Sequence, residues 1–219
     1  MIAGLLMFVN WGLETFKWKY LLHKQHELSF FRAFGIVFTG ITIGLITPNR
    51  IGEVPGRVWL LADNSNKSKS IALTAVGAYT QLLVTFVIGT IASWKLLNYF
   101  VNDSMSLYIN IALTLTSLLL FFLYIKSESV IRLIGRISLL KSKKLIAGIS
   151  SLNLETLFIT YLLSALRYIV FWVQFYLVLD GFGIPLMGFR ELLLIPFCFM
   201  VASFIPCLLY TSDAADEGH

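Results

Sequence analysis

The sequence predicts an all-α, polytopic helical membrane protein with about four full spans, one re-entrant helical hairpin and an incomplete second hairpin. The chain has 219 residues, of which 58% are hydrophobic and 13% are charged, whereas about 25% are charged in soluble globular domains. Apolar stretches at residues 71–97, 105–125 and 157–179 are long enough to cross a bilayer, which takes about 20 residues. The net charge of +5 is typical of basic cytoplasmic loops and does not indicate a nucleic-acid partner.

The first helix is predicted at residues 2–22. Asn10, Glu14 and Lys17 follow one another at spacings of four and three, so they share one helix face. Two interpretations stay open. The helix end lies at the membrane interface, where Lys17 reaches water, or Glu14 faces a polar interior of the bundle.

A polar elbow interrupts the apolar residues 34–61. Pro48 has no amide donor and disfavours helical backbone at Thr47, so the incoming helix should end there. Asn49 is a suitable N-cap for a second short helix. We therefore predict a helical hairpin whose structural elbow residues are Pro48 and Gly52 and whose charged residues are Arg50, Glu53 and Arg57.

The charge of the loops predicts that this hairpin is re-entrant. Loops 23–33, 62–70 and 126–155 are basic and should be cytoplasmic, so the segment between the first two must enter and leave on one side. A helix from Gly35 to Ile46 would have about 12 residues and reach roughly 18 Å, well short of the ~30 Å hydrocarbon core. A re-entrant hairpin is thus favoured over two very short crossings.

Charges placed at depth by such a hairpin need partners or a ligand, because each costs ~2.5–3.5 kcal/mol at mid-bilayer. Glu53 and Arg57 are four apart and could pair. Arg50 stands beside a helix start, where amide donors and the dipole favour an anion such as phosphate. The alternative is that all three lie at the cytoplasmic surface and solvate a turn.

Arg167 is the other candidate, because it falls near the middle of the span at residues 157–179. An arginine at that depth is a functional hypothesis by default, and the alternative is a structural ion pair with Glu53 or Glu14. The resulting lipid-headgroup site consists of Arg50, Glu53, Arg57 and Arg167, supported by Asn10, Glu14, Asn49, Gln81 and Gln174.

The rest of the chain adds less. Residues 192–209 are apolar but contain Pro196 and Pro206, which predicts a broken helix. Residues 210–219 are polar and aperiodic, and we interpret them as a non-native or disordered tail. The cysteines and the His23-x-x-His26 pattern do not indicate a disulfide framework or a metal site, so we expect no cofactor.

Several motifs together resemble a known family. They are NWGLETFKWKYLL with Lys17-Trp18, Thr47-Pro48 followed by Gly52-Glu53 and Arg57, and LSALRYIVFWVQF with Arg167. This pattern is similar to the membrane region of lysylphosphatidylglycerol synthase and its stand-alone, flippase-like relatives in bacteria and archaea. Gly56 shifts the arginine by one position from the commonest spacing. The resemblance covers about residues 9–206, and the interrupted second elbow suggests a truncated fragment.

The resemblance implies a protein of the bacterial inner membrane that binds and translocates an anionic or aminoacylated phospholipid between leaflets. The synthase's soluble transfer domain is absent, so we expect no enzymatic activity. Two other hypotheses stay open: a membrane component for export of polyprenyl-phosphate-linked sugars, and a structural membrane protein without a transported substrate. The partners implied are a membrane phospholipid, an aminoacyltransferase or glycosyltransferase, and a second copy of the chain.

Overall fold

The structure is a computed structural model that describes residues 2–47, 52–61, 67–127, 152–184 and 188–204. These ranges are helical throughout, with short turns and no strand, which confirms the predicted all-α class. The helices are α1 (Ile2–Leu22), α2 (Phe30–Ile46), α3 (Glu53–Trp59), α4 (Lys67–Leu96) with the 3-10 turn η2 (Leu97–Tyr99), α5 (Asp103–Ile125), α8 (Leu154–Gly181) and α9 (Phe189–Phe204).

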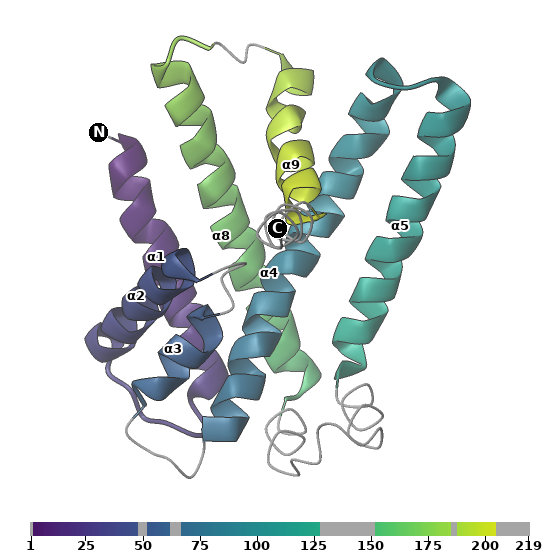
Figure 1. Cartoon of the computed structure of the whole chain (residues 1–219). Helices are drawn as coiled ribbons and strands as arrows, with labels where there is room; N and C mark the ends of the chain where they lie inside the picture. Colours follow the sequence, from purple (N-terminus) through teal and green to yellow (C-terminus); the bar gives the residue numbers. More distant parts are fainter. Residues whose placement is uncertain (1, 48–51, 62–66, 128–151, 185–187, 205–219) are drawn as a thin grey trace, which may run out of the picture.

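Three helical segments in the described part of the chain are long and apolar enough to cross a membrane: α4 with η2, α5, and α8. They identify a polytopic membrane protein. α1 has 21 residues, but any 18-residue stretch of it contains Glu14, Lys17 and Lys19, so composition alone does not mark it as a span. It nevertheless packs along α8 over much of its length (Figure 1).

α4 occupies the centre of the bundle and packs against α5, α8 and α9 (Figure 1). The helix ends at Leu22, Lys67, Ile125 and Leu154 all lie at the lower end of Figure 1, whereas η2, the end of α8 and the start of α9 lie at the upper end. The helix ends that flank the basic loops therefore share one end of the bundle, as the charge pattern requires. That this end faces the cytoplasm remains a prediction.

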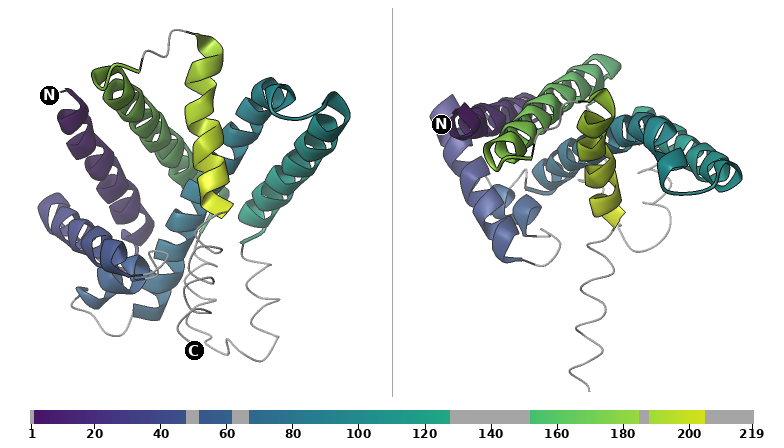
Figure 2. Two further views of the ribbon diagram at one scale, coloured as in Figure 1. Left: turned by 45° about the horizontal axis from the view of Figure 1, so that its top comes forward. Right: turned by 90° about the horizontal axis from the view of Figure 1, so that it is seen from above.

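The α2–α3 hairpin differs in orientation from the long helices. α2 is foreshortened in Figure 1 and seen lengthwise from above in Figure 2, so it runs across the bundle. It begins at Phe30, capped by the Ser29 hydroxyl, five residues before the start used in the sequence argument, and its 17 residues measure about 25 Å. α3 has seven residues and measures about 10 Å. That this hairpin is re-entrant in the membrane stays a prediction.

Glycines allow α3 to lie directly on α2. A Cβ at Gly40 would stand 2.3 Å from Arg57 Cγ, and a Cβ at Gly44 would stand 3.0 Å from Glu53 Cβ. At the elbow, the Gly52 amide donates to the Thr47 hydroxyl at 3.0 Å, and a Cβ at Gly52 would lie 2.7 Å from the same oxygen. Small residues at this spacing are the usual means of close helix approach in membranes.

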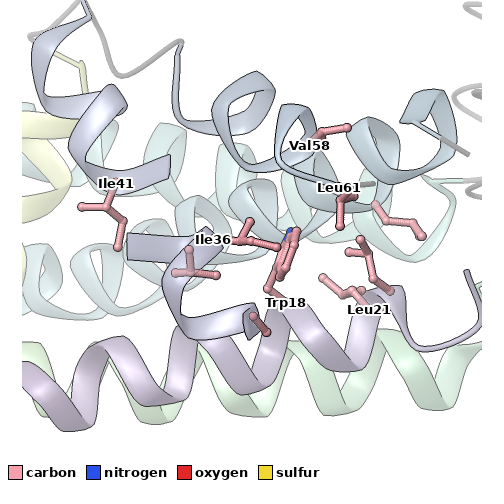
Figure 3. Close-up of a cluster of buried hydrophobic side chains, with 10 residues drawn as sticks. Trp18, Leu21, Ile36, Ile41, Val58 and Leu61 are labelled. Carbon is pink, nitrogen blue, oxygen red and sulfur yellow. The ribbon is translucent and has the colours of Figure 1, made fainter. Parts of the chain in front are cut away.

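An apolar cluster fixes the hairpin against α1 and α4 (Figure 3). Trp18 is buried at its centre, and its indole N–H donates to the Thr74 hydroxyl at 2.9 Å. The labelled members come from α1, α2, α3 and the short segment after α3: Trp18, Leu21, Ile36, Ile41, Val58 and Leu61.

α9 is not broken at Pro196, contrary to the prediction for residues 192–209. The helix runs continuously from Phe189 to Phe204. Proline cannot donate to the carbonyl four residues earlier, but the Trp172 indole of α8 donates to that carbonyl, on Leu192, at 3.1 Å. A neighbouring helix thus satisfies the acceptor that the proline leaves open. Pro206 and the predicted tail lie outside the described residues.

The close approach of α2 and α3 generates a matched pair of substitutions. Gly40→Ala places a methyl group into Arg57 and should lower the free energy of unfolding by about 1–3 kcal/mol. Gly35→Ala, in the same helix, meets nothing within 4 Å and should leave stability unchanged or slightly higher. Denaturation in mixed detergent micelles measures both, and equal stability would contradict this packing.

The shared end of the basic loops generates a topology prediction. In a Cys198→Ser, Cys207→Ser background, Lys24→Cys and Lys126→Cys should react with an impermeant maleimide only after cells are permeabilised. Asn102→Cys, at the opposite end of the bundle, should react in intact cells. Equal labelling of positions 24 and 102 from outside would contradict the proposed orientation.

Candidate functional site

The site is built around the carboxylate of Glu14, which α1 carries to the point where α3 and α8 approach it. Three cations bind this carboxylate: Lys17 Nζ at 2.8 Å, Arg57 Nη1 at 2.7 Å and Arg167 Nη1 at 2.9 Å. Glu14 is only 5% exposed. One acidic residue therefore ties three helices together.

Lys17 lies one turn from Glu14 on the same face of α1 and is 1% exposed. Its ammonium also donates to the Gly77 carbonyl of α4 at 3.3 Å. A Cβ at Gly77 would lie 3.0 Å from Leu21, so α1 and α4 are in close contact here. Of the two interpretations of this face, the structure supports the one in which Glu14 faces a polar interior.

Arg57 is an internal structural cation. Besides Glu14 it binds Glu53, four residues earlier on α3, through Nη2. It is 3% exposed, and its Nε has no hydrogen-bond partner among the described residues. Both Nη groups are thus occupied by carboxylates, and Arg57 holds the hairpin against α1.

Arg167 of α8 is bound differently. Its Nε donates to Asn10 Oδ1 at 2.9 Å, and its Nη1 donates to Glu14 and, at 3.4 Å, to Gln81 Oε1. Asn10 Nδ2 donates back to the Arg167 carbonyl at 3.4 Å. Within the described ranges, Nη2 has no hydrogen-bond partner, and the side chain is 20% exposed.

Arg167 forms part of the wall of a cavity of about 590 Å³ that is bordered by α1, α2, α4, α8 and α9. The polar part of the wall is Asn10, Gln81, Thr85, Arg167, Gln174 and Ser203. The remainder is mostly apolar and aromatic: Met7, Trp11, Ile41, Tyr168, Phe171, Phe199 and Ala202. The cavity therefore combines a guanidinium and several amides with a surface suited to hydrocarbon.

The structure separates the predicted site residues into groups. Arg167, Asn10, Gln81 and Gln174 line the cavity. Glu14, Glu53 and Arg57 form the ion-pair cluster next to it, and Gly52 closes the elbow. Arg167 pairs with Glu14, the second of the two partners considered for it. Pro48, Asn49 and Arg50 lie outside the described residues.

Sequence reasoning missed the buried role of Lys17 and the aromatic wall of the cavity. The spacing of Lys17 after Glu14 was a usable signal, but the neighbouring Lys19 and Trp18 favoured a membrane-interface interpretation. Trp11, Phe171 and Phe199 occur among many other aromatic residues, so nothing in the sequence marks them as neighbours of Arg167.

These features define a class of protein: an integral helical membrane protein in which a buried charged cluster borders an amphipathic cavity. The chain matches the family model of the lysylphosphatidylglycerol synthase TM region over residues 1–208. It therefore belongs to that family, which confirms the resemblance drawn from its motifs. No curated protein and no solved structure matches the chain.

The sharing of Glu14 by three cations generates a stability prediction. Glu14→Gln keeps the shape of the side chain but leaves Lys17, Arg57 and Arg167 without their common counter-ion. Removing one partner of buried ion pairs costs about 3–5 kcal/mol. Detergent denaturation should show a loss of that size.

Glu27→Gln is the matched control, because Glu27 is exposed at the end of the same N-terminal region. It should leave the unfolding midpoint unchanged. A Glu14→Gln protein as stable as the control would show that the cluster does not hold the helices together.

Proposed function

We propose that the protein binds the phosphate of an anionic phospholipid at Arg167 and moves the lipid between the leaflets of the membrane. The observation that carries the proposal is the state of Arg167. Its Nε and Nη1 are held by Asn10, Glu14 and Gln81, while Nη2 has no partner in the described part of the chain and the residue lines a cavity.

The chemistry of the cavity supports a phospholipid. A planar guanidinium with a spare nitrogen donates charge-assisted hydrogen bonds to phosphate oxygens. The same cavity presents Trp11, Phe171 and Phe199, which offer an apolar surface to the upper acyl chains. Polar and apolar walls in one space match the junction between a lipid headgroup and its hydrocarbon.

Glu14 allows the site to be stable with and without lipid. In the structure Glu14 binds Arg167, so the guanidinium keeps an acidic partner when no lipid is bound. A phosphate that draws Arg167 away from Glu14 still leaves that carboxylate bound to Lys17 and Arg57. Ligand binding would then loosen the contact between α8 and α1, and a change of this kind is what lipid transfer needs.

The hypothesis of a structural protein without substrate requires arginines that are matched by acids and closed off. Arg57 meets that description, since it is 3% exposed and binds two carboxylates. Arg167 does not, since it shares Glu14 with two other cations and borders a cavity. The contrast between the two arginines favours a binding function.

We further propose that the chain acts in the cytoplasmic membrane of a bacterium, with the end that carries the basic loops facing the cytoplasm. The cavity wall supplies amides, hydroxyls and a guanidinium, which suit binding and release of a lipid. Any covalent change to the lipid would then fall to a partner enzyme, such as an aminoacyltransferase.

Arg167→Gln tests the proposal. In vesicles containing fluorescently labelled short-chain phosphatidylglycerol, protection from dithionite measures transfer between leaflets. Arg167→Gln should reduce transfer to the level of protein-free vesicles, because the phosphate loses its charged partner. Arg167→Lys keeps the charge but loses the planar fork of donors and should give an intermediate rate.

Folding and surface charge are controlled separately. Arg167→Gln leaves Glu14 with Lys17 and Arg57, so it should destabilise the protein less than Glu14→Gln. Arg32→Gln removes one exposed positive charge from α2 and should transfer lipid at the unmodified rate. Full transfer by a folded Arg167→Gln protein would end the proposal.

A further inference from the structure

A second cavity lies apart from the one at Arg167, at the end of the bundle that carries the basic loops. It measures about 410 Å³ and lies between the C-terminal end of α1 and the start of α2. Its lining residues are Lys19, His23, His26, Glu27, Leu28 and Ser29, and none of them lines the first cavity. The two cavities therefore present separate sets of chemical groups.

Lys19 and Glu27 bring opposite charges to this second cavity without pairing with each other. Within the described part of the chain, neither side chain makes an ion pair or a hydrogen bond. A single ligand that carries both a phosphate and an ammonium could bind both residues, because each of its charges would meet the opposite one.

His23 supplies a second acceptor beside the Glu27 carboxylate. Its Nδ1 lies 2.6 Å from the Tyr20 carbonyl oxygen. A carbonyl oxygen only accepts, so Nδ1 carries the proton, and Nε2 of the neutral ring is an acceptor. The ring is stacked on Tyr20 with 5.5 Å between the centroids, which holds its plane. Glu27 and His23 Nε2 thus offer two acceptors to the N–H groups of an ammonium.

The segment that carries these groups is held on both sides. His26 Nε2 is hydrogen-bonded to the hydroxyl of the buried Ser70 at 2.9 Å, which ties the α1–α2 connection to α4. The Ser29 hydroxyl accepts from the Arg32 amide and caps α2. The cavity is therefore formed without a ligand, which lowers the cost of binding one.

An exposed apolar surface adjoins the cavity. Phe30 and Phe31 follow its last lining residue directly, and their side chains are 38% and 87% exposed. α2 buries its opposite face, including Ala33, Ile36 and Val37. Exposed aromatic residues next to charged groups are typical of the membrane–water boundary. This surface favours a lipid over a soluble ligand, because acyl chains can cover it.

We infer that this cavity binds a zwitterionic phospholipid with a phosphoethanolamine headgroup. The phosphate binds Lys19, the ammonium binds Glu27 and His23, and the acyl chains lie beside Phe30 and Phe31. The inference is independent of the proposed function, because it uses no residue of the cavity at Arg167 and requires no transfer of the bound lipid.

Titration of the purified chain in an uncharged detergent tests the headgroup. Dioctanoyl phosphatidylethanolamine should bind roughly tenfold more tightly than dioctanoyl phosphatidylcholine, whose quaternary ammonium has no N–H to donate. Glycerophosphoethanolamine has the same headgroup without acyl chains and should bind more weakly by at least about tenfold. Equal binding of this soluble ester and the lipid would overturn the lipid assignment.

Two variants assign the binding to this cavity. Lys19→Gln and Glu27→Gln should each weaken binding of phosphatidylethanolamine roughly tenfold. Glu27→Gln should also remove the preference over phosphatidylcholine, an effect that a purely structural role would not produce. Lys126→Gln and Glu155→Gln are the matched controls, because both residues are exposed and neither lines the cavity. The controls should bind as the unmodified protein does.

The same titrations in an Arg167→Gln background separate the two cavities. Phosphatidylethanolamine should bind there with unchanged affinity, and Glu27→Gln should still weaken it. If Arg167→Gln abolishes this binding while Lys19→Gln and Glu27→Gln leave it intact, the lipid occupies the first cavity and the inference is wrong. Retained preference for phosphatidylethanolamine over phosphatidylcholine in a folded Glu27→Gln protein would overturn it as well.

Discussion

The described structure depends on one buried carboxylate that is shared by cations from its own helix and two others. Glu14 brings Lys17 of α1, Arg57 of α3 and Arg167 of α8 to one place. Among the described residues, the cluster with Glu53 included has three cations and two carboxylates, and therefore a net positive charge of one when all are ionised. In apolar surroundings an excess of positive charge favours an anion, and Arg167 is the member of the cluster that lines the cavity.

The position of the hairpin depends on the same ion-pair cluster and on the close packing of α3 against α2. Arg57 can reach Glu14 because α3 lies directly on α2, and that contact depends on Gly40 and Gly44. Trp18 and its apolar neighbours pack the hairpin against α1 and α4. Packing and ion pairing therefore support the hairpin jointly.

The sequence predicted those features that depend on residues close to one another along the chain. Hydropathy and length marked α4, α5 and α8, and proline chemistry ended α2 near Thr47. Arg167 and Gln81 were predicted as site residues because each lies near the middle of an apolar span, and the structure places them in contact. Contacts between different helices could not be predicted from the sequence. The proximity of Glu14 to Arg57 and Arg167 depends on how α1, α3 and α8 pack, and the acceptor that relieves Pro196 comes from Trp172 on another helix.

Two arginines that bind the same carboxylate can still have different roles, and the structure shows what separates them. Arg57 has a second acid, Glu53, and no contact with the cavity, so its charge is used within the fold. Arg167 has neutral amides as its other partners, Asn10 and Gln81, which orient the guanidinium without cancelling its charge. In the proposed function, these amides hold Arg167 in position and leave its charge available to a phosphate.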